Sequence, residues 1–295
     1  MVKYLAKTCC LASFASVTTL KTLIQKQYKL LNEHTGYDVG LFNRDFIRHR
    51  ITIQAVQRYA PHETHPVVLD VAAGWAVPSR VMMQDFRYRV FAIDSLLTGG
   101  EEVLRLTNRT LPTVAIWDLL TQDLPIRTES VHVVLFLATI EHLRDSPKSV
   151  LEEFRRILKR GGILIIDTPN VLELRKRIML LLGKQIMPSI QFVYHSTFHS
   201  GHHREYTLDD LVKVLDWSKF RILQATILDT LSGLSMAKRV PDSKREAGDE
   251  FSQMTRWDVG FHPLRLYDWA KLPLSVLVKL VPSLRDTLFA VARKE

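Results

Sequence analysis

Short runs of β-branched and other apolar residues alternate with helix-like patterns through the centre of the chain. This alternation is typical of a largely parallel sheet covered by helices, the doubly wound α/β arrangement. Seven strands are expected, at Val67–Val71, Arg89–Ile93, Thr113–Trp117, Val131–Leu137, Gly162–Asp167, Phe220–Leu228 and Thr287–Ala292.

Helical periodicity is expected between these strands. The helix Ser149–Lys159 should end at Gly161, because glycine readily adopts the left-handed conformation that terminates helices. Further helices are predicted at Leu172–Leu182 and Thr207–Leu215, the second beginning with a capping box of Thr207 and Asp210.

Two terminal segments have apolar helical patterns. Lys21–Asn32 has a rough apolar face, and Trp269–Leu284 is an apolar helix interrupted by prolines. The second is expected to pack on the core, because it lacks the basic polar face of an interfacial helix. No run of 18 or more apolar residues occurs, so no membrane-spanning helix is expected.

These patterns predict a helical cap over residues 1–50 and one α/β domain over residues 51–295, with insertions at about 171–206 and 230–285. With 46% hydrophobic and 24% charged residues, the composition is that of a globular protein and argues against disorder and integral membrane proteins. The net charge of +9 favours an anionic partner or surface. Cys9 and Cys10 are adjacent and poorly placed for a disulfide, which favours a reducing cytoplasm.

Acidic residues lie at or just after the ends of the first three expected strands. Asp70 lies in the first strand, just before the small-residue turn Ala72 to Ala76. Asp94 ends the second strand, 20 residues after Gly74, which is the spacing of an acid that binds ribose hydroxyls. Asp118 follows Trp117, and this pair could contact an adenine. Because ligands of open α/β sheets bind at the carboxyl ends of the strands, the pattern predicts a nucleoside ligand there.

The ordered set of motifs resembles the class I S-adenosylmethionine-dependent methyltransferases, most closely the ubiquinone-biosynthesis type and those encoded with glycan-assembly enzymes. The resemblance covers about residues 51–206 and implies the Rossmann-like methyltransferase fold, a mostly parallel seven-stranded sheet whose last strand is antiparallel. Its motifs are Leu69–Gly74, Ala92–Asp94, Trp117–Asp118, Val133–His142, Glu153–Asn170 and His203–Thr207.

The resemblance implies S-adenosyl-L-methionine as cofactor and assigns residues to its parts. The methionine end would be held by Asp70, Ala72 and Gly74, and the ribose by Asp94. The adenine would lie near Trp117 and Asp118, with the backbone near Leu137 lining the open face. The family usually has glycine at the positions of Ala72 and Ala76. The loop is expected to bind unless these positions require positive φ.

Histidines are the natural bases if the acceptor is a hydroxyl, and the choices include His142 and His203 beside His195, His199 and His202. No metal site is expected, because ubiquinone-pathway relatives have an acidic residue where this chain has Ala138. Arg204 and Tyr206 could bind an acidic or sugar acceptor or could instead form a structural hinge. The scattered basic clusters, including Arg48 to Arg50, are interpreted mostly as solvated faces.

The sequence therefore predicts O-methylation of a sugar, glycan or lipid-linked acceptor by a cytoplasmic protein, with peripheral contact to an acidic membrane left open. RNA or small-molecule methylation is the alternative, although nucleic acid is disfavoured because no RNA-binding module is visible. A binding protein with a degenerate cofactor site is a second alternative. A nicotinamide-dependent dehydrogenase ranks last.

Overall fold

The computed structural model describes residues 16–35, 41–94, 114–116, 123–187, 190–195, 201–230 and 276–295. Its seven-stranded sheet has the order β3-β2-β1-β4-β5-β7-β6. The strands are β1 (Val67–Val71), β2 (Arg89–Asp94), β3 (Val114–Ile116), β4 (Val131–Leu137), β5 (Leu158–Pro169), β6 (Phe220–Leu228) and β7 (Thr287–Lys294). The pairs among β1 to β5 are parallel, whereas β7 is antiparallel to both of its neighbours. The predicted mostly parallel sheet with an antiparallel last strand is confirmed.

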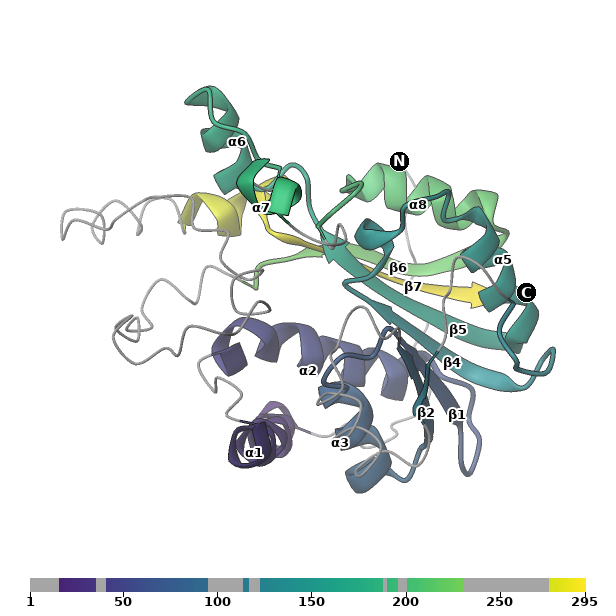
Figure 1. The fold of residues 1–295 in the computed structure, drawn as a ribbon. Helices are drawn as coiled ribbons and strands as arrows, with labels where there is room; N and C mark the ends of the chain where they lie inside the picture. The colour runs from purple at the N-terminus through teal and green to yellow at the C-terminus, as the bar shows by residue number, and fades with distance from the viewer. Residues whose placement is uncertain are drawn as a thin grey trace.

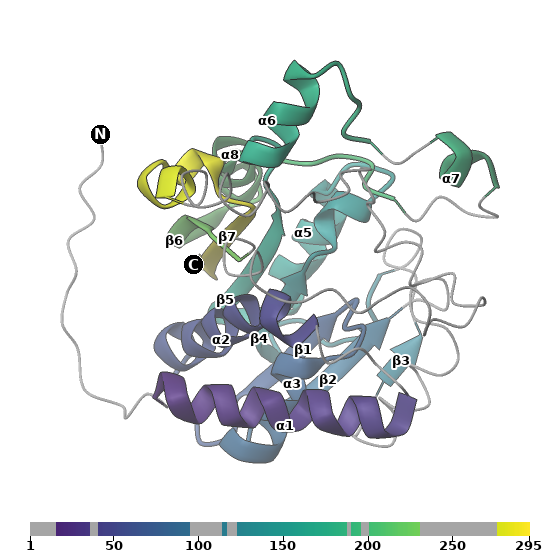
Figure 2. The ribbon, with the colours of Figure 1, turned by 90° about the vertical axis from the view of Figure 1, so that its left-hand side faces the viewer.

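Helices cover both faces of this sheet (Figures 1 and 2). One face carries α1 (Val17–Thr35), α2 (Leu41–Tyr59) and α3 (Val77–Phe86), and the other carries α5 (Lys148–Ile157) and α8 (Leu208–Trp217). The remaining described helices are α6 (Leu174–Leu181), α7 (Ile190–His195), the short 3₁₀ turns η1 (Ile140–His142) and η4 (Pro282–Leu284), and residues 276–280.

Strand β4 shows why the central strands are continuous apolar runs. Val133 and Leu135 belong to the core beneath α1, α2 and α3, while Val134 and Phe136 belong to the core beneath α5 and α8. The ring of Phe136 meets the ring of Phe154 on α5 edge to face, with centroids 5.0 Å apart. Both faces of the strand are therefore buried, as in other α/β proteins.

The start of β5 differs from the prediction. Helix α5 ends at Ile157 and β5 begins at Leu158, which pairs with Val131 of β4. Gly161, with φ of 78°, therefore lies within the strand, and the prediction that the helix continues to Lys159 is wrong. Pairing with β4 decides the conformation here, which a local helical pattern cannot show.

The capping box of α8 is confirmed, since Thr207 Oγ1 accepts from the Asp210 amide and the Asp210 carboxylate accepts from the Thr207 amide. Helix α2 crosses residue 50, and the division of the chain at that residue stays a prediction. No helix in the described part of the chain is long and apolar enough to cross a membrane.

The apolar segment near the C-terminus was predicted to pack on the core. For residues 276–281 this prediction is wrong. Four of its apolar side chains are exposed, at Val276, Leu277, Leu280 and Val281. Residues 269–275 of the predicted helix lie outside the described residues.

Candidate functional site

Three buried aspartates lie at the carboxyl ends of parallel strands. Asp70 is on β1, Asp94 ends β2 and Asp167 is near the end of β5; their exposed fractions are 3%, 5% and 1%. The structure thus places the predicted Asp70 and Asp94 at one edge of the sheet and adds Asp167. Such an edge is where doubly wound sheets bind ligands.

Asp70 has an unfavourable environment for its charge. Burial raises the pKa of Asp70 to about 7, a hydrogen bond from Ser79 opposes this rise, and the charges of Asp94 and Asp167 add to it. The Ser79 hydroxyl donates to Asp70 Oδ2 over 2.6 Å. The edge therefore concentrates negative charge, and a cationic ligand would be stabilised beside it.

The loop after β1 is left-handed at three positions. Ala72, Gly74 and Ala76 have φ of 54°, 48° and 51°. The Gly74 amide donates to Asp94 Oδ2 over 2.7 Å, which joins the loop to the end of β2. A methyl group added at Gly74 would have no atom within 4 Å, so the space beside this backbone is open to a ligand. Both alanines take the conformation for which glycine is favoured.

Arg80 of α3 holds this loop through a hydrogen bond. Its side chain is buried, and Nε donates to the Trp75 carbonyl over 2.9 Å. Burial lowers the pKa of Arg80 to about 10, which still leaves the guanidinium charged at neutral pH. Arg80 therefore fixes the loop conformation and adds a positive charge beneath it.

Arg48 of α2 is the countercharge of Asp167. Its Nη2 and Nε donate to the two oxygens of Asp167 over 3.0 and 3.3 Å, and the Ala138 amide donates to Asp167 Oδ1 over 2.8 Å. Burial alone would lower the pKa of Arg48, but Asp167 and Asp45 raise it. The interpretation of Arg48 as part of a solvated face is wrong. Sequence reasoning also missed Asp167, although this residue follows the same strand-end pattern as Asp94.

Glu141 and two histidines gather beyond the end of β4. Glu141 is buried, and its Oε2 accepts from the Thr168 hydroxyl over 2.9 Å. Burial raises the pKa of Glu141 to about 7, and the proximity of His202 opposes the rise. The ring of His142 lies edge to face with that of His202, with centroids 4.9 Å apart. The predicted base His142 therefore lies beside His202, whereas the predicted His203 reaches the group through its backbone amide, which donates to the Glu141 carbonyl over 2.7 Å.

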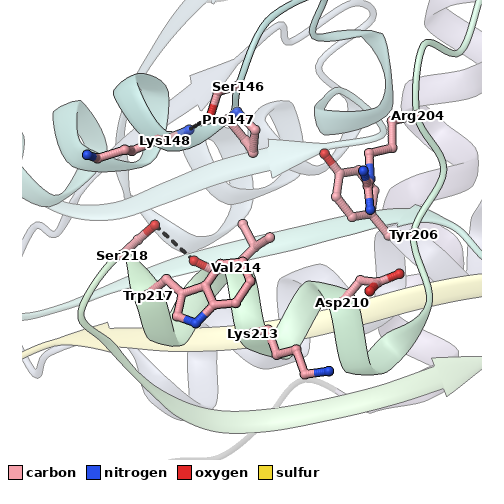
Figure 3. A pocket seen from close by; sticks show the side chains of 10 residues that line it. All are labelled: Ser146, Pro147, Lys148, Arg204, Tyr206, Asp210, Lys213, Val214, Trp217 and Ser218. Atoms are coloured by element: carbon pink, nitrogen blue, oxygen red, sulfur yellow. Dashed lines mark hydrogen bonds between the residues drawn. The ribbon is translucent and has the colours of Figure 1, made fainter.

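Arg204 and Tyr206 line a surface pocket of about 540 Å³ (Figure 3). The Arg204 guanidinium lies 5.6 Å from the centre of the Tyr206 ring. Burial raises the pKa of Tyr206, Arg204 opposes the rise, and the charge of Glu141 adds to it. The Arg204 amide also donates to the Glu141 carbonyl over 3.3 Å, so the pocket adjoins the Glu141 group. The pocket is also lined by Ser146, Pro147, Lys148, Asp210, Lys213, Val214, Trp217 and Ser218.

The remaining predicted residues are placed only in part. Leu137 is at the end of β4, where its carbonyl accepts from the Thr139 hydroxyl over 2.8 Å. Trp117, Asp118 and His199 lie outside the described residues, so the predicted adenine contact stays a prediction.

Comparison with known proteins agrees with the methyltransferase resemblance stated above for the central strands. Residues 69–166 match a family model described as a methyltransferase domain. Over 141 residues, 48% of the chain, the sequence is 30% identical to a protein of Mycobacterium tuberculosis named a probable S-adenosylmethionine-dependent methyltransferase. The match takes in 48% of that relative, so the chain spans about half the length of the curated proteins it matches.

Solved structures share the fold. A SAM-dependent methyltransferase from Archaeoglobus fulgidus is matched with a TM-score of 0.51 and 14% identity, over 87% of this chain and 100% of that one. The [4+2]-cyclase SpnF is matched with a TM-score of 0.52 and 14% identity, over 95% and 97%. At these identities the likeness is one of fold, and this fold carries more than one reaction.

Proposed function

Since residues 69–166 form a class I S-adenosylmethionine-dependent methyltransferase domain, we propose that the chain transfers a methyl group to an oxygen of a sugar, glycan or lipid-linked acceptor. S-adenosyl-L-methionine is the cofactor of this domain, and it supplies an electrophilic methyl group on a sulfonium. The acceptor class is inferred from the resemblance to glycan-cluster methyltransferases and from the charge of the pocket.

One observation carries the proposal: the open left-handed loop lies beside a cluster of buried carboxylates. Asp70, Asp94 and Asp167 place negative charge at the strand ends, with Arg48 as the partner of Asp167. A ligand with a sulfonium and an ammonium group suits that charge, and the hydroxyls of its ribose suit Asp94. The residues present therefore fit the cofactor.

The acceptor side is basic and aromatic. Lys148, Arg204 and Lys213 line the pocket together with the exposed ring of Trp217, and Asp210 is the acidic residue among the lining (Figure 3). Lysine and arginine bind phosphate and carboxylate groups, and an exposed indole offers an apolar face to a sugar ring. These side chains support an anionic glycan or a pyrophosphate-linked acceptor.

In the transfer, the protein orients the acceptor oxygen and excludes water from it. Glu141, beside the acceptor pocket and buried, would accept a hydrogen bond from the acceptor hydroxyl. His142 is the base to which the hydroxyl proton would pass as the oxygen attacks.

A lipid-linked acceptor agrees with the exposed apolar residues near α6. Helix α6 lies near the helix at 276–280, whereas α7 lies on the other side of α6 (Figure 2). Arg177 Nη2 of α6 donates to the Ser283 carbonyl over 3.5 Å. The exposed apolar side chains of α6, of the residue after it and of the helix at 276–280 include Leu180, Leu181, Leu182 and Leu280, with Arg175, Lys184 and Lys279 close in sequence. Apolar residues beside basic ones suit an anionic lipid surface.

Sedimentation with vesicles tests this membrane contact. The wild-type chain should pellet with vesicles of phosphatidylglycerol and much less with phosphatidylcholine. A Leu181→Glu substitution should reduce the bound fraction, because Leu181 is 86% exposed and its side chain would enter the lipid. A Lys21→Glu change on α1 serves as the charge control. Equal pelleting of all three chains would contradict the contact.

Titration calorimetry with S-adenosylhomocysteine tests the cofactor site. We expect saturable binding by the wild-type chain, weakened about 10- to 100-fold in Asp94→Ala, because hydrogen bonds to a charged group contribute about 1.5–3 kcal/mol. Asp209→Ala, a surface change on α8, should leave the affinity unchanged, and NADH should not bind. Formation of S-adenosylhomocysteine in the presence of lipid-linked sugars then tests the acceptor class.

A different reaction on the same site is the second candidate. It is favoured by Ala72 and Ala76, which take left-handed conformations that suit glycine, and by the sharing of this fold with a [4+2]-cyclase. Binding of S-adenosylhomocysteine without turnover of S-adenosylmethionine on any acceptor would support it. Failure to bind either ligand would support a binding protein that has lost the cofactor.

A further inference from the structure

Three metal-binding groups lie together beyond the end of β4. One donor atom from each of Glu141, His142 and His202 lies within 4.8 Å of the other two. Glu141 and His142 belong to η1, whereas His202 comes from the loop that precedes α8, more than fifty residues later. The fold therefore assembles a carboxylate and two imidazoles that the sequence separates.

Backbone hydrogen bonds hold the two segments in register. The amides of His203 and Arg204 donate to the Glu141 carbonyl over 2.7 and 3.3 Å. Beside them, Asn170 pairs with Tyr206 through a parallel bridge. The position of His202 relative to η1 is thus fixed by main-chain contacts and does not depend on the side chains of the group.

His202 and Glu141 are each held in place by a hydrogen bond to a neighbouring polar side chain. His202 Nδ1 lies 2.7 Å from Glu205 Oε1, and Glu205 is paired with the buried Lys176. When the carboxylate accepts from Nδ1, the Nε2 atom of His202 is left as the metal ligand. The Thr168 hydroxyl donates to Oε2 of Glu141 and so fixes the orientation of that carboxylate. Carboxylate–histidine pairs of this kind orient the ligands of metal sites.

We propose that Glu141, His142 and His202 bind a divalent transition metal, with zinc the ion that suits them best. Two imidazoles and one carboxylate are a ligand set of zinc sites that keep a fourth position open. The sequence made a metal site unexpected because Ala138 stands where relatives have an acidic residue. In the proposed site, His202 from the distant loop supplies the third ligand instead.

The open position would bind the acceptor oxygen, and this role rests on the proposed function. The amide of Arg204, which lines the acceptor pocket, donates to the Glu141 carbonyl, and the Glu141 carboxylate accepts from Thr168, the neighbour of Asp167. The group therefore lies between the acceptor pocket and the cofactor edge. A bound metal would stabilise the deprotonated acceptor oxygen, with the proton leaving to solvent. His142 would then be a ligand and no longer the base.

Zinc binding by the chain, without cofactor or acceptor, tests the site directly. After treatment with a chelator, calorimetric titration with zinc chloride should show one site per chain. His202→Ala should weaken binding by more than about a hundredfold, and Glu205→Gln by about 10- to 100-fold, because partners behind a ligand have effects of that size. His195→Ala removes a histidine outside the group and should leave binding unchanged. Circular dichroism of each metal-free variant checks that it is folded.

Cobalt(II) gives a second readout, since a histidine and carboxylate site should give visible absorption that disappears in His202→Ala. The proposal is overturned if no saturable zinc binding is found, or if His202→Ala and His195→Ala bind zinc equally. S-adenosylhomocysteine binding separates the two proposals. If the nucleoside binds and zinc does not, the metal site alone fails, and the reverse result refutes the proposed function alone.

Discussion

The left-handed conformation of the alanines in the loop after β1 predicts how the stability of the protein should respond to glycine at Ala72. At Ala72, φ is 54°, a conformation in which the Cβ atom of an L-residue is crowded by the following carbonyl, at a cost of about 1–2 kcal/mol. Replacing Ala72 by glycine removes this strain. The half-buried methyl group contributes little packing, so strain should dominate the effect in the folded state.

The unfolded chain opposes the gain. An extra glycine increases the conformational entropy of the unfolded state, which destabilises by about 0.4–1 kcal/mol. We therefore expect Ala72→Gly to raise the free energy of unfolding by about 0.5–1 kcal/mol. Ala73 is the matched control, since it lies in the same loop but outside the positive-φ residues. Ala73→Gly should lower the free energy of unfolding by about 0.4–1 kcal/mol.

Urea unfolding followed by circular dichroism measures both variants against the wild-type chain. The midpoints should move in opposite directions with the slope m unchanged, because the surface exposed on unfolding is the same. The separation between the variants should be about 1–2 kcal/mol. If Ala72→Gly is no more stable than Ala73→Gly, the loop does not carry the strain that its backbone angles indicate.

Three further outcomes follow from the site and its surroundings. Because the pKa of Asp70 is raised from 3.8 to about 7, the folded state holds a proton that the unfolded state has lost between these pH values. The free energy of unfolding should fall as pH rises through this window, with Asp70 contributing at most about 4 kcal/mol. In urea titrations at pH 4 to 8, Asp70→Asn should make the fall smaller and leave the part that comes from Glu141, whose pKa is also raised to about 7. Arg48→Met should destabilise by about 3–5 kcal/mol by leaving Asp167 buried and uncompensated, and adding Asp167→Asn should recover much of the loss; a double variant as unstable as Arg48→Met would contradict this pairing. Thr207→Ala should lower the unfolding free energy by about 1 kcal/mol through the loss of the α8 cap, and Thr128→Ala, a change outside any cap, should lower it less in the same thermal melt.

Much of the fold was accessible from local patterns. The seven strands were found because buried strands are short β-branched runs, and the α8 cap was found because Thr207 and Asp210 have the spacing that satisfies the first amides of a helix. The start of β5 was missed because Leu158 pairs with Val131, a contact 27 residues away in sequence. A local pattern contains no information about that pairing.

The residues of the candidate site also fall into those that local patterns predict and those that only the fold brings together. Asp70 and Asp94 were predicted because strand ends carry ligand contacts, and Asp167 could have been found by the same reasoning. The pairing of Arg48 with Asp167 joins residues 119 apart, and only the fold shows it. The same is true of His202, whose position beside Glu141 depends on how the loop before α8 crosses the end of β4. Distant contacts of this kind have no signature in a single sequence.

The sheet order has a consequence for how the chain assembles. Among the described strands, β6 is bonded to β7 alone, and β7 lies between β5 and β6 although it follows both in sequence. Until residues 287–294 emerge from the ribosome, β5 therefore has a bare edge and β6 has no partner in the sheet. Helix α8 packs on β6 and β7, so the surface to which it docks is also incomplete until then. The order of synthesis thus differs from the order of assembly, and the bare edge of β5 is the place where a nascent or truncated chain would associate with others.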